Sequence, residues 1–425
     1  MHNDFSNKLD LQEENNTESM AQVIVIGILA LLTILAPALL HTNQYEFIIQ
    51  RFKVDLLNAS YFDTALYTSY LITGIVTALL SNQIGKRKIF ILLGSIGSAI
   101  SYLFMTLTLN FPLLLTVRFV QGSFTVLCWQ ILMTLVLDLS TTRNRGKNVG
   151  LFGIFLALAM GSGPVAGGIL ASLGVLIPYY TAALLSILVF LASLVLLKEP
   201  QQLISKPSII ENVVIAFRRP RLIIPGIFNF VDRFHIGFIL FILPLFLQIE
   251  LGAKPEVRGM VLGFFALPFI ILQYPVGRWS DKIGRIKPLI LGSISVGIML
   301  SIMGFLGSFG LFAVIIAFII LGTSNGFTGP PAMALVGDSV EADDNVTGMG
   351  FFNLLGNLGI IIGPLIGGFL IKYTDFVVAF VVAGSIELIS LAGIILLIQF
   401  PFKKKPLYLK SITENKTDYI SSGMK

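Results

Sequence analysis

The chain has 425 residues, of which 55% are hydrophobic and only 12% are charged, and its net charge is +6. A soluble domain usually carries about 25% charged residues, so this composition excludes an ordinary soluble protein. Apolar stretches of about 20 residues recur from Val23 to Phe400, and each is long enough to cross a hydrocarbon core. They do not alternate polar and apolar residues as the strands of a membrane barrel do. We therefore expect an all-α polytopic membrane protein.

Taken in chain order, the apolar stretches predict about twelve membrane-spanning helices. We expect them at roughly 23–43, 61–80, 89–109, 112–136, 149–172, 177–197, 222–247, 259–277, 289–309, 311–335, 347–371 and 376–398. The first follows a polar, mostly acidic stretch and has no small-residue cleavage site, so it is interpreted as a retained helix rather than a signal peptide. The single cysteine, Cys128, has no internal disulfide partner and is expected to pack within its helix.

The basic residues indicate the orientation of these helices. Most of them fall in the two tails and in the connections on the same side as the tails. Five fall on the other side, namely Arg51, Lys53, Lys254, Arg258 and Lys372. The positive-inside rule then places both termini in the cytoplasm. The expected location is the cell (inner) membrane. Because the positive charge serves to orient the helices, we expect no nucleic-acid partner. The expected partners are the lipid bilayer, a small-molecule substrate and protons. We also expect the protein to be a monomer.

Several features repeat at a nearly constant offset, which predicts two homologous halves. At an offset of 200 lie Gly122 and Gly322, Asp138 and Asp338, Gly150 and Gly350, and the clusters GSGPVAGG (161–168) and IIGPLIGG (361–368). The loops SNQIGKRK (81–88) and SDKIGRIK (280–287) match at an offset of 199. The predicted organisation is a cytoplasmic tail (1–22), a six-helix half (23–197), a cytoplasmic linker (198–221), a second six-helix half (222–400) and a cytoplasmic tail (401–425). Such repeats are common in transporters.

Three motifs resemble those of the major facilitator superfamily. GRWSDKIGR at 277–285 resembles its loop motif G-x-x-x-D-x-x-G-R, VRFVQG at 117–122 resembles its fourth-helix motif R-x-x-Q-G, and GSGPVAGG resembles the fifth-helix motif of its proton-coupled antiporters. The resemblance runs from about Ile24 to Ile398 and is strongest to the drug/proton antiporter branch. It implies the fold of that family and transport by alternating access. One departure is that Asn82 and Gln83 stand where the first loop of the family normally has Asp and Arg.

The resemblance also implies that loop charges latch the two halves on the cytoplasmic side. Residues expected to contribute are Asp138, Asp281, Arg285, Asp338, Lys86 and Arg87. In the predicted topology, Asp138 lies near Lys86 and Arg87, and Asp338 lies near Arg285. The alternative is that these are solvated charges that only set the orientation of the helices.

The two glycine clusters are expected to bring helices into close contact, because helix backbones approach closely in lipid where side chains are absent. The residues concerned are Gly161, Gly163, Pro164, Gly167, Gly168, Gly363, Pro364, Gly367 and Gly368. The prolines weaken the helix, so the family resemblance implies a bending joint. Generic tight packing is the alternative.

Ionisable residues inside the membrane indicate function, because each is costly unless it is paired or hydrated. Arg118 shares a helical face with Gln121 and Thr125, and its counterpart in the second half is Phe318. The resemblance implies that this face lines the transport path. A structural arginine that binds helix-end carbonyls is the alternative.

The seventh predicted helix holds the densest polar cluster, NFVDRFHIGF at 229–238. At about 100° per residue, Asn229, Asp232 and Arg233 share one arc, and His235 lies beside Asp232. We expect these residues to serve the substrate or proton pathway, with Asp232 as the proton carrier, paired with Arg233 or with Arg118 across the cavity. If the helix begins later than predicted, the cluster lies near the cytoplasmic surface instead.

Two further groups are interpreted as structural. Glu387 is in the middle of the last span and is expected to be a protonated, hydrogen-bonded glutamate that faces a neighbouring helix, and His41 is expected at the membrane interface.

The sequence contains no nucleotide-binding P-loop, no metal-ligand spacing and no nucleophile constellation, so we expect neither an enzyme nor a cofactor or metal, and the proton gradient is the expected energy source. Proton-coupled antiport with efflux of a small molecule is the first prediction. Proton-driven uptake of a nutrient or siderophore and a non-transporting membrane sensor are the alternatives.

Overall fold

A computed structural model describes the chain over residues 2–84, 86–140, 144–197, 199, 209–341 and 344–399. The first half contains α1 (His2–Ala38), a short π-helical turn η1 (Tyr45–Gln50), α2 (Leu56–Ile84), α3 (Lys88–Leu107), α4 (Phe111–Asp138), α5 (Arg145–Leu173) and α6 (Ile177–Leu196). The second half contains α8 (Ile223–Ile249), α9 (Pro255–Ile283), α10 (Ile286–Leu306), η3 (Gly307–Phe309), α11 (Leu311–Ser339), α12 (Asn345–Tyr373) and α13 (Phe376–Gln399). Between them lie α7 (Ile209–Arg218) and the short turn η2 (Pro220–Leu222).

The predicted all-α membrane fold is confirmed. Every predicted span corresponds to one long helix, and eleven described helices are long and apolar enough to cross a membrane. The twelfth long helix, α2, is outside that set, and its first turns carry Asp63, Tyr67 and Tyr70. It nevertheless packs lengthwise against α4 and α12, so it belongs to the bundle as the other helices do.

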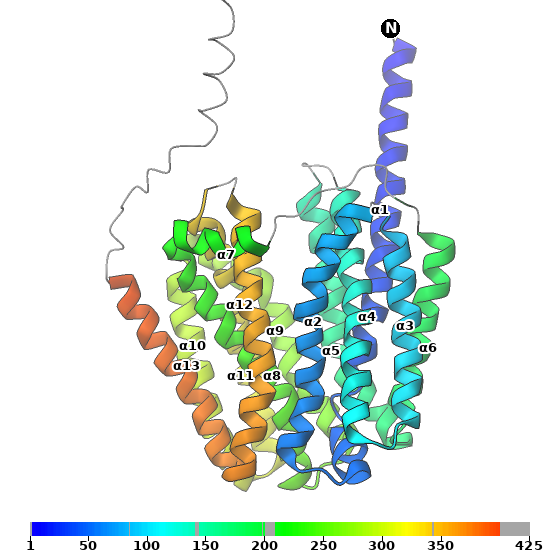
Figure 1. Cartoon of the computed structure of the whole chain (residues 1–425). Coiled ribbons are helices and arrows are strands. Elements are labelled where there is room, and N and C mark those ends of the chain that lie inside the picture. Colours follow the sequence, from blue (N-terminus) through cyan, green and yellow to red (C-terminus); the bar gives the residue numbers. More distant parts are fainter. Residues whose placement is uncertain are drawn as a thin grey trace, which may run out of the picture.

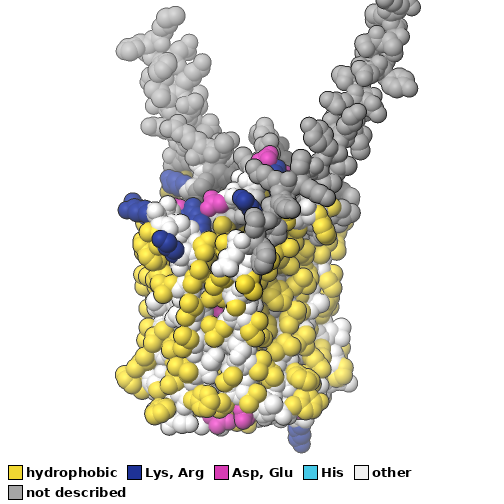
Figure 2. All heavy atoms as spheres, turned by 90° about the vertical axis from the view of Figure 1, so that its left-hand side faces the viewer, with side chains coloured by type: hydrophobic (Ala, Val, Ile, Leu, Met, Phe, Trp, Pro, Cys, Tyr) yellow, Lys and Arg dark blue, Asp and Glu magenta, His cyan; other side chains and the backbone are white. Residues whose placement is uncertain are grey.

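The helices form two bundles that lie side by side, α1–α6 in one and α8–α13 in the other (Figure 1). Most of the described basic residues lie in the connections at one end of the bundles, and we call this end the basic face. The chain enters the bundle from this face, where α1 extends beyond the other helices (Figure 1). The other end is called the opposite face. Between the two faces, the surface of the second bundle is a broad band of apolar side chains (Figure 2).

Local sequence accounts for where the helices begin and end. At the start of α4, the Asn110 side chain accepts a hydrogen bond from the Leu113 amide, and Pro112 fits the first turn because it needs no amide hydrogen. Gly284 ends α9 with a φ of +91°, a conformation that residues with a Cβ avoid. This glycine belongs to the loop motif GRWSDKIGR, so the motif supplies the turn that leads into α10.

The two glycine clusters occupy equivalent places in the two bundles. Gly163 and Gly167 lie against the end of α1, and Gly363 and Gly367 lie against α8. A Cβ at Gly167 would come within 2.2 Å of the Leu39 carbonyl oxygen, so only glycine allows this approach. Each cluster therefore joins its helix to the first helix of its own bundle.

The last glycine of each cluster faces the other bundle instead. A Cβ at Gly168 would meet the Pro255 carbonyl oxygen of α9 at 2.4 Å, and a Cβ at Gly368 would meet Ser60 of α2 at 2.6 Å. The bundles thus contact each other through α5 with α9 and through α12 with α2. The predicted packing role matches these contacts. The helices α5 and α12 continue through Pro164 and Pro364, and bending at these prolines stays a prediction.

The chain boundaries differ in detail from the predicted organisation. Helix α1 begins at His2 and so includes most of the predicted tail 1–22. The predicted linker 198–221 contains α7, which lies across the basic face of the second bundle and contacts α12 (Figure 1). The predicted tail 401–425 lies outside the described residues.

Candidate functional site

The first bundle buries a polar cluster around Arg118 on α4. The guanidinium donates to the Gln121 side-chain oxygen at 2.8 Å and lies 4.3 Å above the centre of the Phe62 ring. Gln121 in turn donates to the Tyr102 hydroxyl at 2.9 Å and to the Thr125 hydroxyl at 2.7 Å. The face shared by Arg118, Gln121 and Thr125 was predicted from their spacing, and the three side chains do interact. All are buried, so the cluster is held in one arrangement.

The charge partner of Arg118 is Asp63 of α2, which sequence reasoning missed. Its carboxylate lies 3.8 Å from the Arg118 guanidinium, and both side chains are fully buried. Asp63 also accepts a hydrogen bond of 2.7 Å from the Gln44 side chain. The predicted span begins at about residue 61, so Asp63 falls close to its start and is not among the residues predicted for the site. The helix begins at Leu56, so Asp63 lies two turns inside it. The sequence signal that could have identified Asp63 is an acidic residue within an apolar stretch.

Three other polar residues are buried in the same bundle. His41, Thr42 and Asn43 are buried in the turn that follows α1, and the imidazole Nδ1 of His41 has no hydrogen-bond partner. The Asn43 side chain donates to the Val175 carbonyl oxygen at 2.8 Å. His41 is thus in the protein interior, within electrostatic range of Asp63 and Arg118, and its place at the membrane interface stays a prediction.

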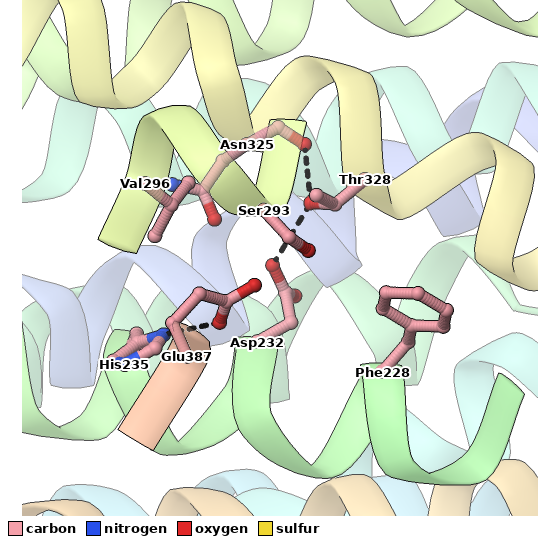
Figure 3. A pocket seen from close by; sticks show the side chains of 8 residues that line it. All are labelled: Phe228, Asp232, His235, Ser293, Val296, Asn325, Thr328 and Glu387. Carbon is pink, nitrogen blue, oxygen red and sulfur yellow. Dashed lines mark hydrogen bonds and ion pairs between the residues drawn. The ribbon is translucent and has the colours of Figure 1, made fainter. Parts of the chain in front are cut away.

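The second bundle buries a different cluster, at the centre of α8. It surrounds a small cavity lined by Phe228, Asp232, His235, Ser293, Val296, Asn325, Thr328 and Glu387 (Figure 3). These side chains come from α8, α10, α11 and α13, so the cavity lies inside the bundle rather than at its surface. Asp232 and His235 were predicted site residues, and Glu387 was interpreted as a structural glutamate. The structure places all three around one cavity.

Asp232 contacts a hydroxyl group rather than a cation. Its Oδ1 lies 3.4 Å from the Thr328 hydroxyl, which also lies 3.0 Å from the Asn325 carbonyl oxygen. The single hydroxyl proton can serve only one of these acceptors at a time. Among the described residues, no Lys, Arg or His nitrogen lies within 4.0 Å of the Asp232 carboxylate. The predicted pairs of Asp232 with Arg233 and with Arg118 are therefore not formed in this structure.

Arg233 and Asn229 lie on the side of α8 that faces α12. Asn229 donates to the Phe352 carbonyl oxygen at 2.7 Å, and the Arg233 stem packs near Gly356. Arg233 is also within electrostatic range of the buried Tyr67 on α2, as are Asp63 and Arg118. Tyr67 is thus within reach of charged residues of both bundles. Asn229 and Arg233 are held apart from the cavity that receives Asp232.

On the basic face, each bundle contains an ion pair between an arginine of a loop and the aspartate predicted to lie near it. Arg87 Nε lies 3.1 Å from Asp138 with both side chains buried, and Arg285 Nε lies 3.1 Å from Asp338. Arg285 also pairs with Asp281. Lys86 is exposed, and its loop neighbour Arg87 makes the contact with Asp138 instead. Both pairs join helices of one bundle, so they do not link the halves in this structure, and the predicted latch between the halves stays a prediction.

Ion pairs between the bundles lie on the opposite face. The buried guanidinium of Arg258, on α9, pairs with both carboxylate oxygens of Glu46 in η1, the shorter distance being 2.5 Å. Lys372 of α12 lies 2.9 Å from Asp55, just before α2. Among the described residues, no such pair joins the bundles on the basic face. The protein is thus held closed at the opposite face.

A second cavity of about 390 Å³ lies between α5 and α9. Its lining is almost wholly apolar and includes Leu158, Val165, Phe264 and Leu267. This volume is within the range of small-molecule pockets. The glycine cluster of α5 contributes Gly161 to its wall, so the predicted packing cluster also borders an open apolar space between the halves.

Comparison with known proteins identifies relatives of the whole chain. The family model described as Major Facilitator Superfamily matches residues 19–231 and again residues 226–418. An uncharacterized MFS-type transporter of Escherichia fergusonii is 25% identical over 345 residues, which cover 80% of this chain and 85% of that protein. The Multidrug resistance protein 2 of Bacillus subtilis is 30% identical over 161 residues, or 38% of this chain and 39% of that protein.

A further relative and two solved structures extend the comparison. The class B tetracycline resistance protein of Escherichia coli is 30% identical over 146 residues, covering 34% of this chain and 35% of that protein. The nucleoside transporter NupG has a TM-score of 0.75 at 13% identity, covering 89% of this chain and 99% of that chain. A bacterial homolog of the human lysosomal transporter Spinster, in an inward-facing and unoccupied conformation, has a TM-score of 0.75 at 15% identity, covering 90% and 97%. At these identities, the structures show a common fold.

Proposed function

The chain belongs to the major facilitator superfamily, and we propose that it is a proton-coupled antiporter that exports a small molecule by alternating access. Membership of this transporter family accounts for the two six-helix bundles and for the membrane location. Proton coupling, efflux and the monomeric state are the proposed parts, as is a cytoplasmic location of the basic face.

The observation that carries the proposal is that each bundle buries a carboxylate in its interior. Asp63 lies beside Arg118 in the first bundle, and Asp232 lies among hydroxyl groups in the second. A buried carboxylate changes its charge when it takes up or loses a proton, and this charge is costly in the membrane interior. Protonation at these positions therefore alters the relative stability of two arrangements of the bundles.

The direction of transport is supported by relatives rather than by geometry. Two of the relatives carry names for drug resistance, and the fifth-helix motif resembles that of proton-coupled antiporters. The solved structure of a nucleoside transporter with the same fold keeps proton-driven uptake as the second candidate. The apolar cavity between α5 and α9 favours an organic cargo with an apolar surface.

Purified protein in liposomes with an imposed pH gradient tests the proposal. Tetracycline, ethidium and adenosine are added in turn while an internal dye reports pH. Movement of protons against the movement of tetracycline or ethidium is the expected result. Co-entry of protons with adenosine supports uptake instead, and absence of flux for a wider panel favours a membrane sensor.

Two variants assign the carriers. Asp232→Asn and Asp63→Asn, each assayed at a temperature at which the variant stays folded, are expected to abolish gradient-driven exchange, while Asp375→Asn, at a loop on the opposite face, serves as a control. Full gradient-driven transport by Asp232→Asn would show that Asp232 is not the proton carrier.

A further inference from the structure

We infer that Asp232, His235 and Glu387 share a stored proton through one water molecule in the cavity of the second bundle. This inference deepens the proposed proton coupling, since it names a proton site in which a residue of the last helix takes part. Figure 3 shows the three side chains converging from α8 and α13.

The hydrogen bond of His235 determines which ring nitrogen faces the cavity. Its Nε2 lies 2.9 Å from the Ala383 carbonyl oxygen. A carbonyl oxygen only accepts hydrogen bonds, so Nε2 carries a proton and donates it. In the neutral ring, Nδ1 is then left with a lone pair.

This lone pair lies beside a carboxylate rather than beside a donor. His235 Nδ1 is 3.3 Å from Glu387 Oε2, the ring is buried, and Nδ1 makes no hydrogen bond of good geometry with the protein. Two acceptors at this separation repel unless a proton lies on one of them. The proton resides on the Glu387 carboxyl group or on the imidazole ring, and in both cases the pair holds it.

Asp232 adds a second carboxylate to the same cavity. Two carboxylates that share a buried site disfavour the state in which both are ionised. The charged group next to Asp232 along α8 is Arg233, which makes no ion pair among the described residues. The facing residues of α10 and α11 are Ser293, Asn325 and Thr328, none of which carries a charge. The proton content of the cavity therefore depends on the charges of Asp232, Arg233, His235 and Glu387.

The cavity has room for one water molecule to connect these groups. It leaves about 10 Å³ for the centre of a water, which is about the space that a single molecule needs. Besides His235 Nδ1, the buried Ser293 hydroxyl on its wall has no hydrogen-bond partner. A water with these two neighbours and the two carboxylates has the polar partners that a buried water requires.

The number and kind of ligands favour a proton over a metal ion. Among the described residues, no three His, Cys, Asp or Glu side chains are placed to hold a metal ion. An imidazole lone pair next to two carboxylates is instead an arrangement in which a proton moves between acceptors over short distances. Charge is conserved when the proton passes from Glu387 or His235 to Asp232.

Infrared and NMR titrations of the full chain in lipid nanodiscs test this inference without substrate or a pH gradient. At neutral pH, we expect either the carbonyl band of a protonated carboxyl group or the ¹⁵N signal of an imidazolium from His235. That signal should disappear with base and should be lost in Glu387→Gln. Glu341→Gln on the basic face and His41→Gln are the controls, and both should leave the signal unchanged.

The involvement of the cavity is tested by a second variant. Ser293→Val fills the cavity and removes a hydroxyl group, and we expect it to shift the titration midpoint by about one pH unit, the size of a lost hydrogen bond to a charged group. A signal that persists unchanged in Glu387→Gln, or an Nδ1-protonated neutral His235 beside an ionised Glu387, overturns the inference. These measurements need no transport, so they can contradict the shared proton while proton-coupled exchange is still observed. Conversely, they can support the shared proton when no proton-coupled exchange is observed.

Discussion

At the scale of single residues, the buried pair of Asp63 and Arg118 shows how neighbouring helices decide the cost of a charge. Removing one member of a buried ion pair leaves the other charge uncompensated, which costs about 3–5 kcal/mol. We expect Asp63→Asn to lower the thermal unfolding midpoint strongly, because Arg118 is fully buried and Asp63 is the one carboxylate paired with it among the described residues.

The double variant Asp63→Asn with Arg118→Gln is the control for this prediction. It removes both charges, so its midpoint should lie well above that of Asp63→Asn. Equal midpoints for the single and the double variant would show that the pair does not determine the stability. Both are measured by thermal unfolding in the same detergent.

The repeat supplies a second comparison at the residue scale. Asp138 and Asp338 are equivalent in sequence, but Asp138 and its partner Arg87 are buried, whereas the side chain of Asp338 is 52% exposed. Exposed ion pairs contribute about 0–1 kcal/mol. We therefore expect Asp138→Asn to lower the unfolding midpoint by several degrees and Asp338→Asn to lower it little.

This comparison needs no further control, because each variant is the reference for the other. Equal losses would contradict the prediction and would indicate that the two positions serve the same role. The measurement is again the unfolding midpoint of the purified protein.

At the scale of elements, most of what the sequence predicted concerns single helices. The twelve spans follow from apolar runs, and the packing role of the glycines follows from their spacing, because both depend on residues near one another in the chain. The partner of Arg118 and the convergence of Glu387 with Asp232 depend on which helices become neighbours. Asp63 lies near the start of the predicted span 61–80 and is not singled out there, whereas α2 begins at Leu56 and carries Asp63 two turns inside the helix.

The glycines that face the other bundle yield a prediction about α5 and α12. A Cβ at Gly168 would approach the Pro255 carbonyl oxygen, and a Cβ at Gly368 would approach Ser60. Substitution by leucine at either position should push the bundles apart at the opposite face. We expect spin-label distances across that face to lengthen in Gly168→Leu and in Gly368→Leu.

Gly153 of α5 provides the matched control, because a Cβ there meets no atom within 4 Å. Gly153→Leu should leave the distances unchanged. If all three variants gave the same distances, the close contacts at Gly168 and Gly368 would not hold the opposite face closed.

At the scale of the whole molecule, the described ion pairs between the bundles lie on one side only. Arg258 with Glu46 and Lys372 with Asp55 join them at the opposite face, while the described ion pairs of the basic face stay within one bundle. If the basic face is cytoplasmic, as proposed, this arrangement is closed on the side away from the cytoplasm. Breaking the contacts of the opposite face would then be the step that allows release on the other side.

The pH dependence of this closure follows from Asp55. A hydrogen bond from the Asn58 amide, together with the Lys372 ammonium, lowers the pKa of the Asp55 carboxyl group below its ordinary value. A depressed pKa means that the contribution of Asp55 is present above the pKa of the unfolded chain and is lost only as the pH falls through the still lower pKa of the folded protein. Mild acidification should therefore leave this pair intact.

We expect spin-label distances across the opposite face to be the same at pH 8 and at pH 5.5 in the native protein, as far as the Asp55–Lys372 pair controls them. Asp55→Asn should lengthen them at both pH values, because the amide removes the charge that holds Lys372. The variant Asp375→Asn changes a carboxylate of a nearby loop on the same face and is the control. If acidification to pH 5.5 lengthened the distances in the native protein but not in Asp55→Asn, a proton on Asp55 itself would open the face, contrary to the prediction. A lengthening of equal size in the native protein and in Asp55→Asn would assign the pH response to the buried carboxylates Asp63 and Asp232. Their protonation would then have to act on the opposite face through the helices that carry them.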